Sequence, residues 1–316
     1  MNYVTKPIAA QKLIESYRQN KPKVYLNHKI QFLGVDDYDV YNISKEFVYQ
    51  DKLIIAGRVE KRNTEICKVA FFEKLSDYQY RVIPDADINL LQDPCVSFYN
   101  DDIVVGGTEI FVEPNTEKIT SWCTSFYSGK SLETLSKVAQ SPLGMKDVRF
   151  IQDGDSLHVF TRPQGIKGGL GKIGYIKLNK LSELNAENLD KATIFDNHFE
   201  SDNWGGANDL HLLKNGLIGV VAHISWRSDD QHLHYYPCVF AFNPKTKQST
   251  AIKILLERKD LQDGPAKYPR LADVIFTGGL IRHENKTATL YMGTSDCEAQ
   301  FAIIDDPFLE YESEAI

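Results

Sequence analysis

Short apolar runs separated by Gly, Asn and Asp make up most of the chain after about residue 20. β-branched and aromatic residues dominate these runs, for example at 52–59, 102–107, 157–162, 217–224 and 273–281. Runs of this length and composition predict β-strands, with the Gly, Asn and Asp positions in turns. The strands come in groups of about four for every ~50–60 residues, and long helical periodicity is scarce. The pattern therefore predicts an all-β fold.

The opening residues are the exception to this pattern. Apolar side chains fall near helical spacing at Ile8, Leu13, Ile14 and Tyr17. Thr5 and Pro7 supply a suitable start, because a hydroxyl cap and an early proline both favour a helix N-terminus. We expect a short amphipathic helix that covers one edge of the fold.

A longer unit recurs five times along the chain. Each copy opens with Asn or Asp, and the copies begin at Asn42, Asp93, Asp147, Asn208 and Asp273, with spacings of 51, 54, 61 and 65 residues. A polar or charged residue recurs at a later position, occupied by Arg58, Glu109, Arg162, His223 and Asp296. Four-stranded units repeated at this period are typical of propeller blades.

We therefore predict one domain, spanning residues 1–316, built as a five-bladed β-propeller with a short N-terminal helix. The predicted blades cover approximately residues 39–80, 91–135, 145–180, 203–250 and 270–306. In a propeller the innermost strands line the central channel, so the two repeated positions should meet around one funnel. Asx turns and strand caps would explain any single Asn or Asp equally well. The polar character of the whole set favours a binding site.

Composition narrows the class of ligand. The chain has 316 residues, with 43 acidic and 36 basic side chains and a formal charge of -7. Non-specific nucleic-acid binding depends on Lys and Arg neutralising phosphates, so this balance argues against nucleic acid as a partner. A small or neutral ligand is the better expectation, and the oligomeric state is left open.

The cysteines and the apolar runs indicate a compartment. Five widely spaced cysteines form no C-x-x-C pair, which favours neither a disulfide framework nor a zinc site. The histidines of residues 211–234 lack a metalloprotease or carboxylate triad pattern, so we expect no metal. No run reaches signal-peptide or membrane-span character, and we expect a cytoplasmic protein without membrane partners.

The segment 90–111 holds the best catalytic candidate. Asp93 precedes Pro94, which favours an extended backbone at the preceding residue, and its carboxyl group could act as a general acid if its pKa were raised. Glu109 follows in the same blade. It could be a second acid, a ligand of a sugar hydroxyl or the partner of an arginine, and we favour hydroxyl binding.

Cationic and imidazole side chains accompany these carboxylates. Arg149 and Arg162 suit bidentate recognition of an oxyanion, and Lys267 lies in a proline-bounded loop where it could bind one as well. His223 occupies the repeated position and is best interpreted as a ligand of an anion or a hydroxyl. The glycines of residues 165–174 lack the strand and helix context of a nucleotide-binding loop, so we expect a flexible hairpin there.

At these residues the chain resembles a known family. The resemblance is carried by DVYNIS, AGRVEKRNTE, LQDPCVSF, GGTEIF, GMKDVRF, FTRPQG, NWGGANDLHLL, AHISW and KYPRLADVIFTGG, which span residues 39–279. These segments are similar to those of the mannosyltransferase/phosphorylases, formerly an uncharacterised domain family. That family is distantly related to the inverting β-mannoside phosphorylases.

The resemblance implies a reaction and a set of roles. It implies reversible phosphorolysis of β-mannosides, with β-1,2-mannooligosaccharides as the expected substrates, which yields α-mannose 1-phosphate with inversion, with inorganic phosphate as co-substrate and no cofactor. Asp93 matches the family's general acid. The phosphate-binding group implied for this chain is Arg149, Arg162, His223 and Lys267. The residues implied to hold the sugar are Asn42, Arg58, Asp147, Asn208 and Asp273, to which the residue analysis adds Glu109.

General chemistry favours the same reaction class. An inverting hydrolase needs a second carboxylate roughly 6.5–9.5 Å from the acid to activate water. Phosphate is itself a nucleophile, so a phosphorylase needs one acid and a cationic pocket. The alternatives are a GDP-mannose-dependent β-mannosyltransferase and a non-catalytic carbohydrate-binding propeller.

Overall fold

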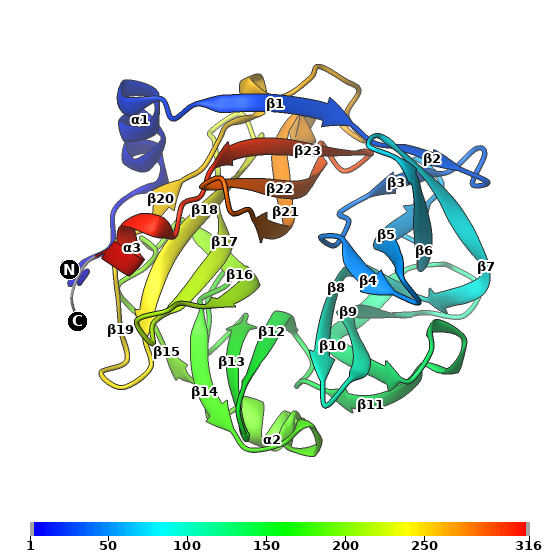
Figure 1. The fold of residues 1–316 in the computed structure, drawn as a ribbon, viewed down its shortest axis with the longest axis horizontal. Helices are drawn as coiled ribbons and strands as arrows, with labels where there is room; N and C mark the ends of the chain where they lie inside the picture. Colours follow the sequence, from blue (N-terminus) through cyan, green and yellow to red (C-terminus); the bar gives the residue numbers. More distant parts are fainter. Residues whose placement is uncertain (1–2, 314–316) are drawn as a thin grey trace.

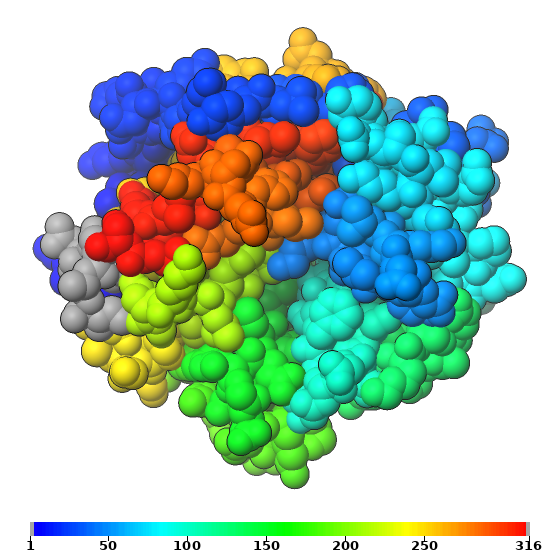
Figure 2. All heavy atoms as spheres, viewed as in Figure 1, coloured from blue at the N-terminus to red at the C-terminus, as the bar shows by residue number. Residues whose placement is uncertain are grey.

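The architecture was analysed in a computed structural model that describes residues 3–313. Its sheets stand around a central axis like the blades of a propeller (Figure 1). Side chains fill most of the space between the ribbons (Figure 2). The prediction of a mainly β fold is confirmed. Within the described residues, no helix is long and apolar enough to cross a membrane.

Two of the sheets contain four strands each. One consists of β8 (Leu91–Tyr99), β9 (Asp102–Val112), β10 (Ile119–Gly129) and β11 (Ser136–Gln140). The other consists of β12 (Met145–Asp153), β13 (Ser156–Pro163), β14 (Gly174–Leu178) and β15 (Thr193–Ile194). In each sheet the strands follow one another antiparallel in chain order, with the first strand at one edge.

A third sheet has six strands. Its members are β2 (Gln31–Leu33), β3 (Asp39–Tyr41), β4 (Phe47–Tyr49), β5 (Lys52–Glu60), β6 (Cys67–Ser76) and β7 (Gln79–Asn89). The strands β3 and β4 both pair with β5, and residues 42–46 connect them. Asn42 therefore leaves the sheet just where β3 ends.

The remaining sheet has nine strands. They are β1 (Val24–Lys29), β16 (Trp204–Leu212), β17 (Ile218–Arg227), β18 (Leu233–Asn243), β19 (Gln248–Ser249), β20 (Lys253–Ile254), β21 (Asp273–Arg282), β22 (Thr287–Thr294) and β23 (Glu298–Asp305). Its two halves are joined where β18 and β21 run parallel for two residue pairs, His234 with Asp273 and Tyr235 with Val274. β1, from the start of the chain, pairs with β23 near its end.

Helices are few and short. The α-helices are α1 (Ala10–Asn20), α2 (Ala186–Leu189) and α3 (Leu309–Ser313). Four 3₁₀ turns complete the set: η1 (Leu132–Thr134), η2 (Leu181–Glu183), η3 (Arg258–Asp260) and η4 (Pro269–Leu271). The largest apolar core packs α1 and the strands β13, β14, β16, β17 and β18 together with the β21–β23 group.

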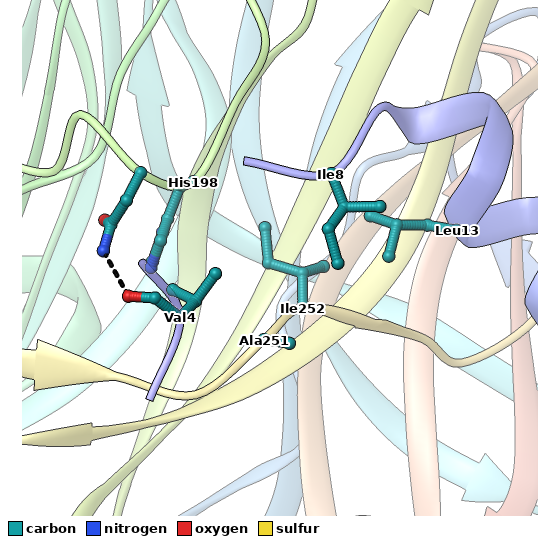
Figure 3. Close-up of a pocket in the computed structure, with 7 residues that line it drawn as sticks. Val4, Ile8, Leu13, His198, Ala251 and Ile252 are labelled. Carbon is teal, nitrogen blue, oxygen red and sulfur yellow. Dashed lines mark hydrogen bonds between the residues drawn. The ribbon is translucent and has the colours of Figure 1, made fainter. Parts of the chain in front are cut away.

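The predicted N-terminal helix is present, and it begins at Ala10, beyond Thr5 and Pro7. No side chain caps it locally; instead the Ala10 N–H donates to Asn203 Oδ1 at 2.8 Å. Leu13, Ile14 and Tyr17 are buried as expected. The segment before the helix packs near His198, where the Asn197 side chain donates to the Val4 carbonyl at 2.8 Å (Figure 3).

Candidate active site

The repeated Asn and Asp positions coincide with irregularities in the innermost strands. The register of β8, β12 and β16 shifts at Asp93, Asp147 and Asn208. Asn42, Asp93 and Asp147 adopt φ values of 45°, 52° and 50°. Asn and Asp tolerate this left-handed conformation better than most residues. A bulge bends the strand and re-aims one side chain, which is how each of these strands presents a polar group to the axis.

In the last copy the bulge falls elsewhere. The register of β21 shifts between Thr277 and Gly279, so Gly278 occupies the bulge rather than Asp273. A Cβ at Gly278 would lie 1.7 Å from the Ile43 carbonyl oxygen, which explains why glycine is needed there. Asp273 begins β21 instead, where its Oδ2 bonds to His234 at 2.7 Å and to the Tyr236 hydroxyl at 2.5 Å.

A cavity of about 190 Å³ lies where these strands converge. Six of the predicted site residues line it: Asn42, Arg58, Asp93, Asp147, Arg162 and His223. They come from all four sheets or, for Asn42, from the segment that follows β3, and they span 181 residues of sequence, from 42 to 223. The repeat therefore brings together most of the side chains that it was used to predict.

Arg58 connects the carboxylates on one side of the cavity. It is buried, and its Nη1 approaches Asp93 Oδ1 at 3.3 Å. Its Nε and Nη2 donate to Glu60 at 3.0 and 2.7 Å, and Nη2 also donates to Glu65 at 2.9 Å. Asp93 Oδ1 accepts a second hydrogen bond, at 2.8 Å, from the Asn42 amide. Every nitrogen of Arg58 is therefore already in use by protein carboxylates.

Arg162 forms a second ion pair across the cavity. Its Nη1 donates to Asp147 Oδ2 at 2.9 Å and its Nε to the Gly205 carbonyl at 3.0 Å. Burial alone would favour the neutral acid, but the charges of Arg162 and Arg149 outweigh it and lower the pKa of Asp147. A Cβ at Gly206 would lie 2.7 Å from Arg162 Cδ, so this glycine makes room for the guanidinium.

His223 is neutral in this setting. Complete burial lowers the pKa of His223 to about 3. Its Nδ1 bonds to Asn208 Oδ1 at 2.8 Å, whereas its Nε2 is buried without a partner. Asn42 Oδ1 and Asn208 Nδ2 are also buried and unpaired within the described residues. Buried polar atoms are normally satisfied, so this cluster of orphaned groups is consistent with a bound polar ligand.

Lys267 lies behind the cavity rather than on its wall. Its Nζ contacts Glu60 Oε1 at 2.5 Å and Glu65 Oε1 at 2.7 Å, and the side chain is 2% exposed. Burial would lower the pKa of Lys267, but the hydrogen bonds to these two glutamates outweigh it and raise the pKa. In this arrangement the ammonium group neutralises protein carboxylates.

Four other predicted residues also lie off the wall. Glu109 accepts hydrogen bonds from Ser125 and Lys137, at 2.6 and 2.5 Å. It lies one residue beyond Thr108, which pairs with the cavity-lining Gln92. Side chains alternate between faces along a strand, so a shift of one residue turns Glu109 away. Arg149 is buried below the wall, where its Nε donates to the Asn208 carbonyl at 3.1 Å. Asn208 touches His223 from behind, and Asp273 has been described above.

Sequence reasoning missed several cavity residues. Glu65, Gln92, Lys146 and Tyr235 line the cavity but were not selected, and Asp296 was marked by the repeat without being assigned a role. Lys146 makes no hydrogen bond or ion pair with any described residue, and its Nζ lies 5.2 Å from the Trp122 ring centroid. Burial lowers the pKa of Lys146. The sequence feature that could have identified Lys146 is its position directly before Asp147, at the start of the bulge.

The part of the wall next to His223 is largely apolar. It consists of Leu233, Tyr235, Leu271, Val274 and Phe276, which come from β18, η4 and β21. Tyr235 is fixed by a 3.0 Å hydrogen bond that its hydroxyl accepts from Trp204 Nε1. A pocket with one polar and one apolar wall suits a sugar, because a pyranose ring presents hydroxyls at its edge and C–H groups on its faces.

The fold and the site define the class of this protein: a β-propeller with a ligand cavity lined by the ends of its inner strands. Comparison with known proteins identifies its family. Residues 16–310 match the family model described as "Protein of unknown function (DUF1861)". The chain belongs to this family of mannosyltransferase/phosphorylases. Comparison with curated protein sequences gives no match.

Solved structures from Leishmania mexicana are similar over almost the whole chain. A mannose phosphorylase, solved with a phosphate ion, is 32% identical with a TM-score of 0.88, over 97% of this chain and 95% of the other. A GDP-Man-dependent mannosyltransferase is 26% identical with a TM-score of 0.87, over 98% and 96%. A β-1,2-mannobiose phosphorylase from Listeria innocua shares the fold, at 11% identity and a TM-score of 0.62, over 88% and 93%.

Proposed function

We propose that this protein is an inverting glycoside phosphorylase that acts on β-mannosides and reversibly forms α-mannose 1-phosphate. The observation that carries the proposal is the composition of the cavity. It combines a carboxyl pair, Asp93 and Asp296, with Lys146, a cation that no described residue neutralises. The 32% identity to a mannose phosphorylase supports the same substrate class.

The phosphate would bind near Lys146 and Arg162. Lys146 has no partner among residues 3–313, and Arg162 uses only Nε and Nη1 in its described hydrogen bonds, which leaves Nη2 for an oxyanion. Arg58 and Lys267 are less suited, because glutamates already occupy their nitrogens. His223 would contact the ligand through its orphaned Nε2 as a neutral group. Of the four residues predicted to bind phosphate, Arg162 and His223 remain in the proposed site, and Lys146 is added to it.

Asp93 would deliver the proton to the glycosidic oxygen. It lines the cavity, and Asn42 and Arg58 fix its Oδ1 while no described hydrogen bond occupies Oδ2. As phosphate attacks C1 from the opposite side, the leaving oxygen takes this proton. Replacing Asp93 by Asn should reduce phosphorolysis by about 10²–10⁴-fold. A variant with full activity would show that the acid is another residue.

Hydrolysis is less well supported by the geometry. The base of an inverting hydrolase must be a free carboxylate facing the attacking water. Glu109 is turned toward Ser125 and Lys137, and Asp147 is paired with Arg162. Neither carboxylate is free to act as that base. Asp296 lines the cavity without a hydrogen bond or ion pair to a described residue, and phosphate-independent release of mannose would assign the base to it instead.

Transfer from GDP-mannose is the second candidate function, and the 26% identical mannosyltransferase favours it. The cavity holds about 190 Å³, below the ~300–1,000 Å³ usual for drug-sized ligands, so it suits a monosaccharide and phosphate better than a whole nucleotide sugar. A non-catalytic carbohydrate-binding propeller would bind sugar without turnover, and Asp93→Asn would leave its binding unchanged.

One set of incubations separates these functions. The protein is given mannose 1-phosphate with mannose, then β-1,2-mannobiose with and without phosphate, and finally GDP-mannose with mannose. Phosphate release in the first and phosphate-dependent mannose 1-phosphate in the second support a phosphorylase and the β-1,2 linkage. Products from GDP-mannose alone would support the transferase, and phosphate-independent mannose would support a hydrolase.

The blade count belongs to the same proposal. We infer five blades, with the nine-stranded sheet counted as two, because its halves pair over only two residues of β18 and β21. Each half also has its own innermost bulged strand, β16 and β21. Four bulges, in β8, β12, β16 and β21, and the break in pairing after β3 would then mark one position in each blade.

A further inference from the structure

Asp296 stands on a rigid turn at the cavity. The turn joins β22 to β23, and both Ser295 and Asp296 have a φ of 53°. Four hydrogen bonds anchor Ser295. Its N–H donates to the Val274 carbonyl at 2.8 Å and its hydroxyl to the Ala272 carbonyl at 3.0 Å, while its carbonyl accepts from the backbone N–H of Lys267 at 3.0 Å and its hydroxyl accepts from Arg258 Nε at 3.3 Å. The side chain that follows is therefore held against the cavity by a fixed backbone.

The carboxyl group of Asp296 makes no hydrogen bond or ion pair with any described residue. Ionisable groups from several elements face it; these are Arg58, Lys267, Asp93, Glu65, Tyr41 and Tyr235. Burial raises the pKa of Asp296 to about 6; the charge of Arg58 opposes this shift and that of Asp93 adds to it. Near neutral pH this group keeps its proton in an appreciable fraction of molecules.

Asp93 has different surroundings in the same cavity. Its Oδ1 accepts hydrogen bonds from Asn42 and from the guanidinium of Arg58, at 2.8 and 3.3 Å. Two carboxyl groups that share a cavity but not an environment can divide the acid and the carboxylate forms between them. When such groups interact, the proton belongs to the pair rather than to either residue.

We propose that Asp296 is the resting site of the catalytic proton, which it shares with Asp93. This inference rests on the phosphorylase function proposed above. When substrate binds, the proton passes from Asp296 to Asp93 and then to the leaving oxygen. Asp296 acts through Asp93 and is therefore a positioning residue for the proton.

The reaction balances with this assignment. A phosphate oxygen bonds to the mannose C1 while the bond from C1 to the leaving oxygen breaks, and the electron pair stays on that oxygen. The leaving oxygen takes the proton from Asp93. The attacking hydrogen phosphate, on the opposite face of the sugar, loses its proton to solvent as mannose 1-phosphate forms, and the carboxyl pair takes one proton from solvent. The pair ends the cycle with the one proton it had at the start.

Replacing Asp296 by Asn tests the proposal. Asn tolerates a positive φ and has nearly the same shape, but its amide cannot hold a transferable proton. Above pH 7, phosphorolysis of β-1,2-mannobiose should fall on the order of 10²-fold, and the alkaline limb of the rate profile should move to lower pH. Phosphorolysis of 2,4-dinitrophenyl β-mannoside should change little, because its leaving group departs without protonation.

Asp101→Asn is the matched control. Asn100 and Asp101 form the turn between β8 and β9 with φ values of 47° and 68°, and Asp101 is exposed outside the cavity. The same substitution in a similar backbone should leave both activities and their pH profiles unchanged. Thermal unfolding of both variants shows whether each is folded.

The outcomes separate this inference from the function on which it rests. If Asp296→Asn slows both substrates equally at every pH and raises KM, Asp296 is a sugar ligand and the inference is overturned. If the variant keeps the wild-type profile, the inference also fails while phosphorolysis stands. If the wild-type protein forms no mannose 1-phosphate from any β-mannoside, the proposed function itself is wrong.

Discussion

Lys267 offers a decisive perturbation, because two roles for it predict different measurements. The resemblance implies a phosphate ligand, whereas the structure pairs its ammonium group with Glu60 and Glu65. Lys267→Met keeps most of the side-chain volume and removes the charge. Glu60, which is 1% exposed, would then lose one of its partners in a site that water hardly reaches.

The expected loss follows from that burial. Removing one partner of a buried ion pair destabilises a protein by about 3–5 kcal/mol, since the remaining charge is left uncompensated. Glu60 would still accept hydrogen bonds from Tyr41 and Arg58, so we expect a value near the lower end, about 3 kcal/mol. Adding Glu60→Gln should recover part of this loss, because the uncompensated charge is then absent.

Urea unfolding of the two variants measures these differences, and phosphorolysis at varied phosphate measures the other role. Lys253→Met is a suitable control, because Lys253 pairs with Glu310 at the surface, where both side chains are about half exposed. Such pairs contribute about 0–1 kcal/mol. A Lys267→Met protein of unchanged stability with a much higher KM for phosphate would refute the structural role.

Three further predictions concern the other side of the cavity and the acid range. Gly206→Ala should lower kcat/KM at least tenfold with little change in unfolding temperature, because the added Cβ displaces Arg162; wild-type kinetics would show that the guanidinium can shift freely. Arg162→Ala should mainly raise the phosphate concentration needed for half-maximal rate, as initial-rate measurements would show, and an unchanged requirement would exclude it from the phosphate site. The pKa values of Asp147 and Glu65 are lowered on folding, so their stabilisation is present above about pH 4 and lost as pH falls through their folded values. Urea unfolding at pH 6, 4.5 and 3.5 should follow this decline, and a flat profile would contradict it.

The strand pattern and the repeat predicted much of the candidate site, because each blade of a propeller repeats the same strands and therefore the same polar positions along the sequence. Asp93 and Asp147 reach the cavity through bulges and Asn42 from the end of β3, and Arg58 and Arg162 line the same cavity from β5 and β13. For the fifth copy of the repeat, the sequence matched Asp273 to the other copies by residue type. What recurs in the structure is the register shift of the strand, and in β21 this shift falls at Gly278, which has no side chain.

Other features depend on contacts that no local pattern contains. Lys267 and Glu60 are 207 residues apart, so their pairing is not visible in the segment around either residue. Glu109 is one residue beyond Thr108, the partner of the cavity-lining Gln92, and a difference of one residue is within the error of any alignment of repeats but enough to reverse the side chain's direction. Lys146 occupies neither of the repeated positions, so the repeat does not mark it.

The pairing of β1 with β23 has a consequence for how the protein is made. His28 lies opposite Phe301, so the sheet that contains the end of the chain is completed by a strand from its beginning. During synthesis β1 emerges before β23 and lacks this partner until all the strands between them have been made. The turn that carries Asp296 lies between β22 and β23 and is likewise made after the other sheets. A nascent or C-terminally truncated chain can therefore fold several of its sheets before the cavity is complete. Activity then requires that β23 has paired with β1 and closed the ring of sheets.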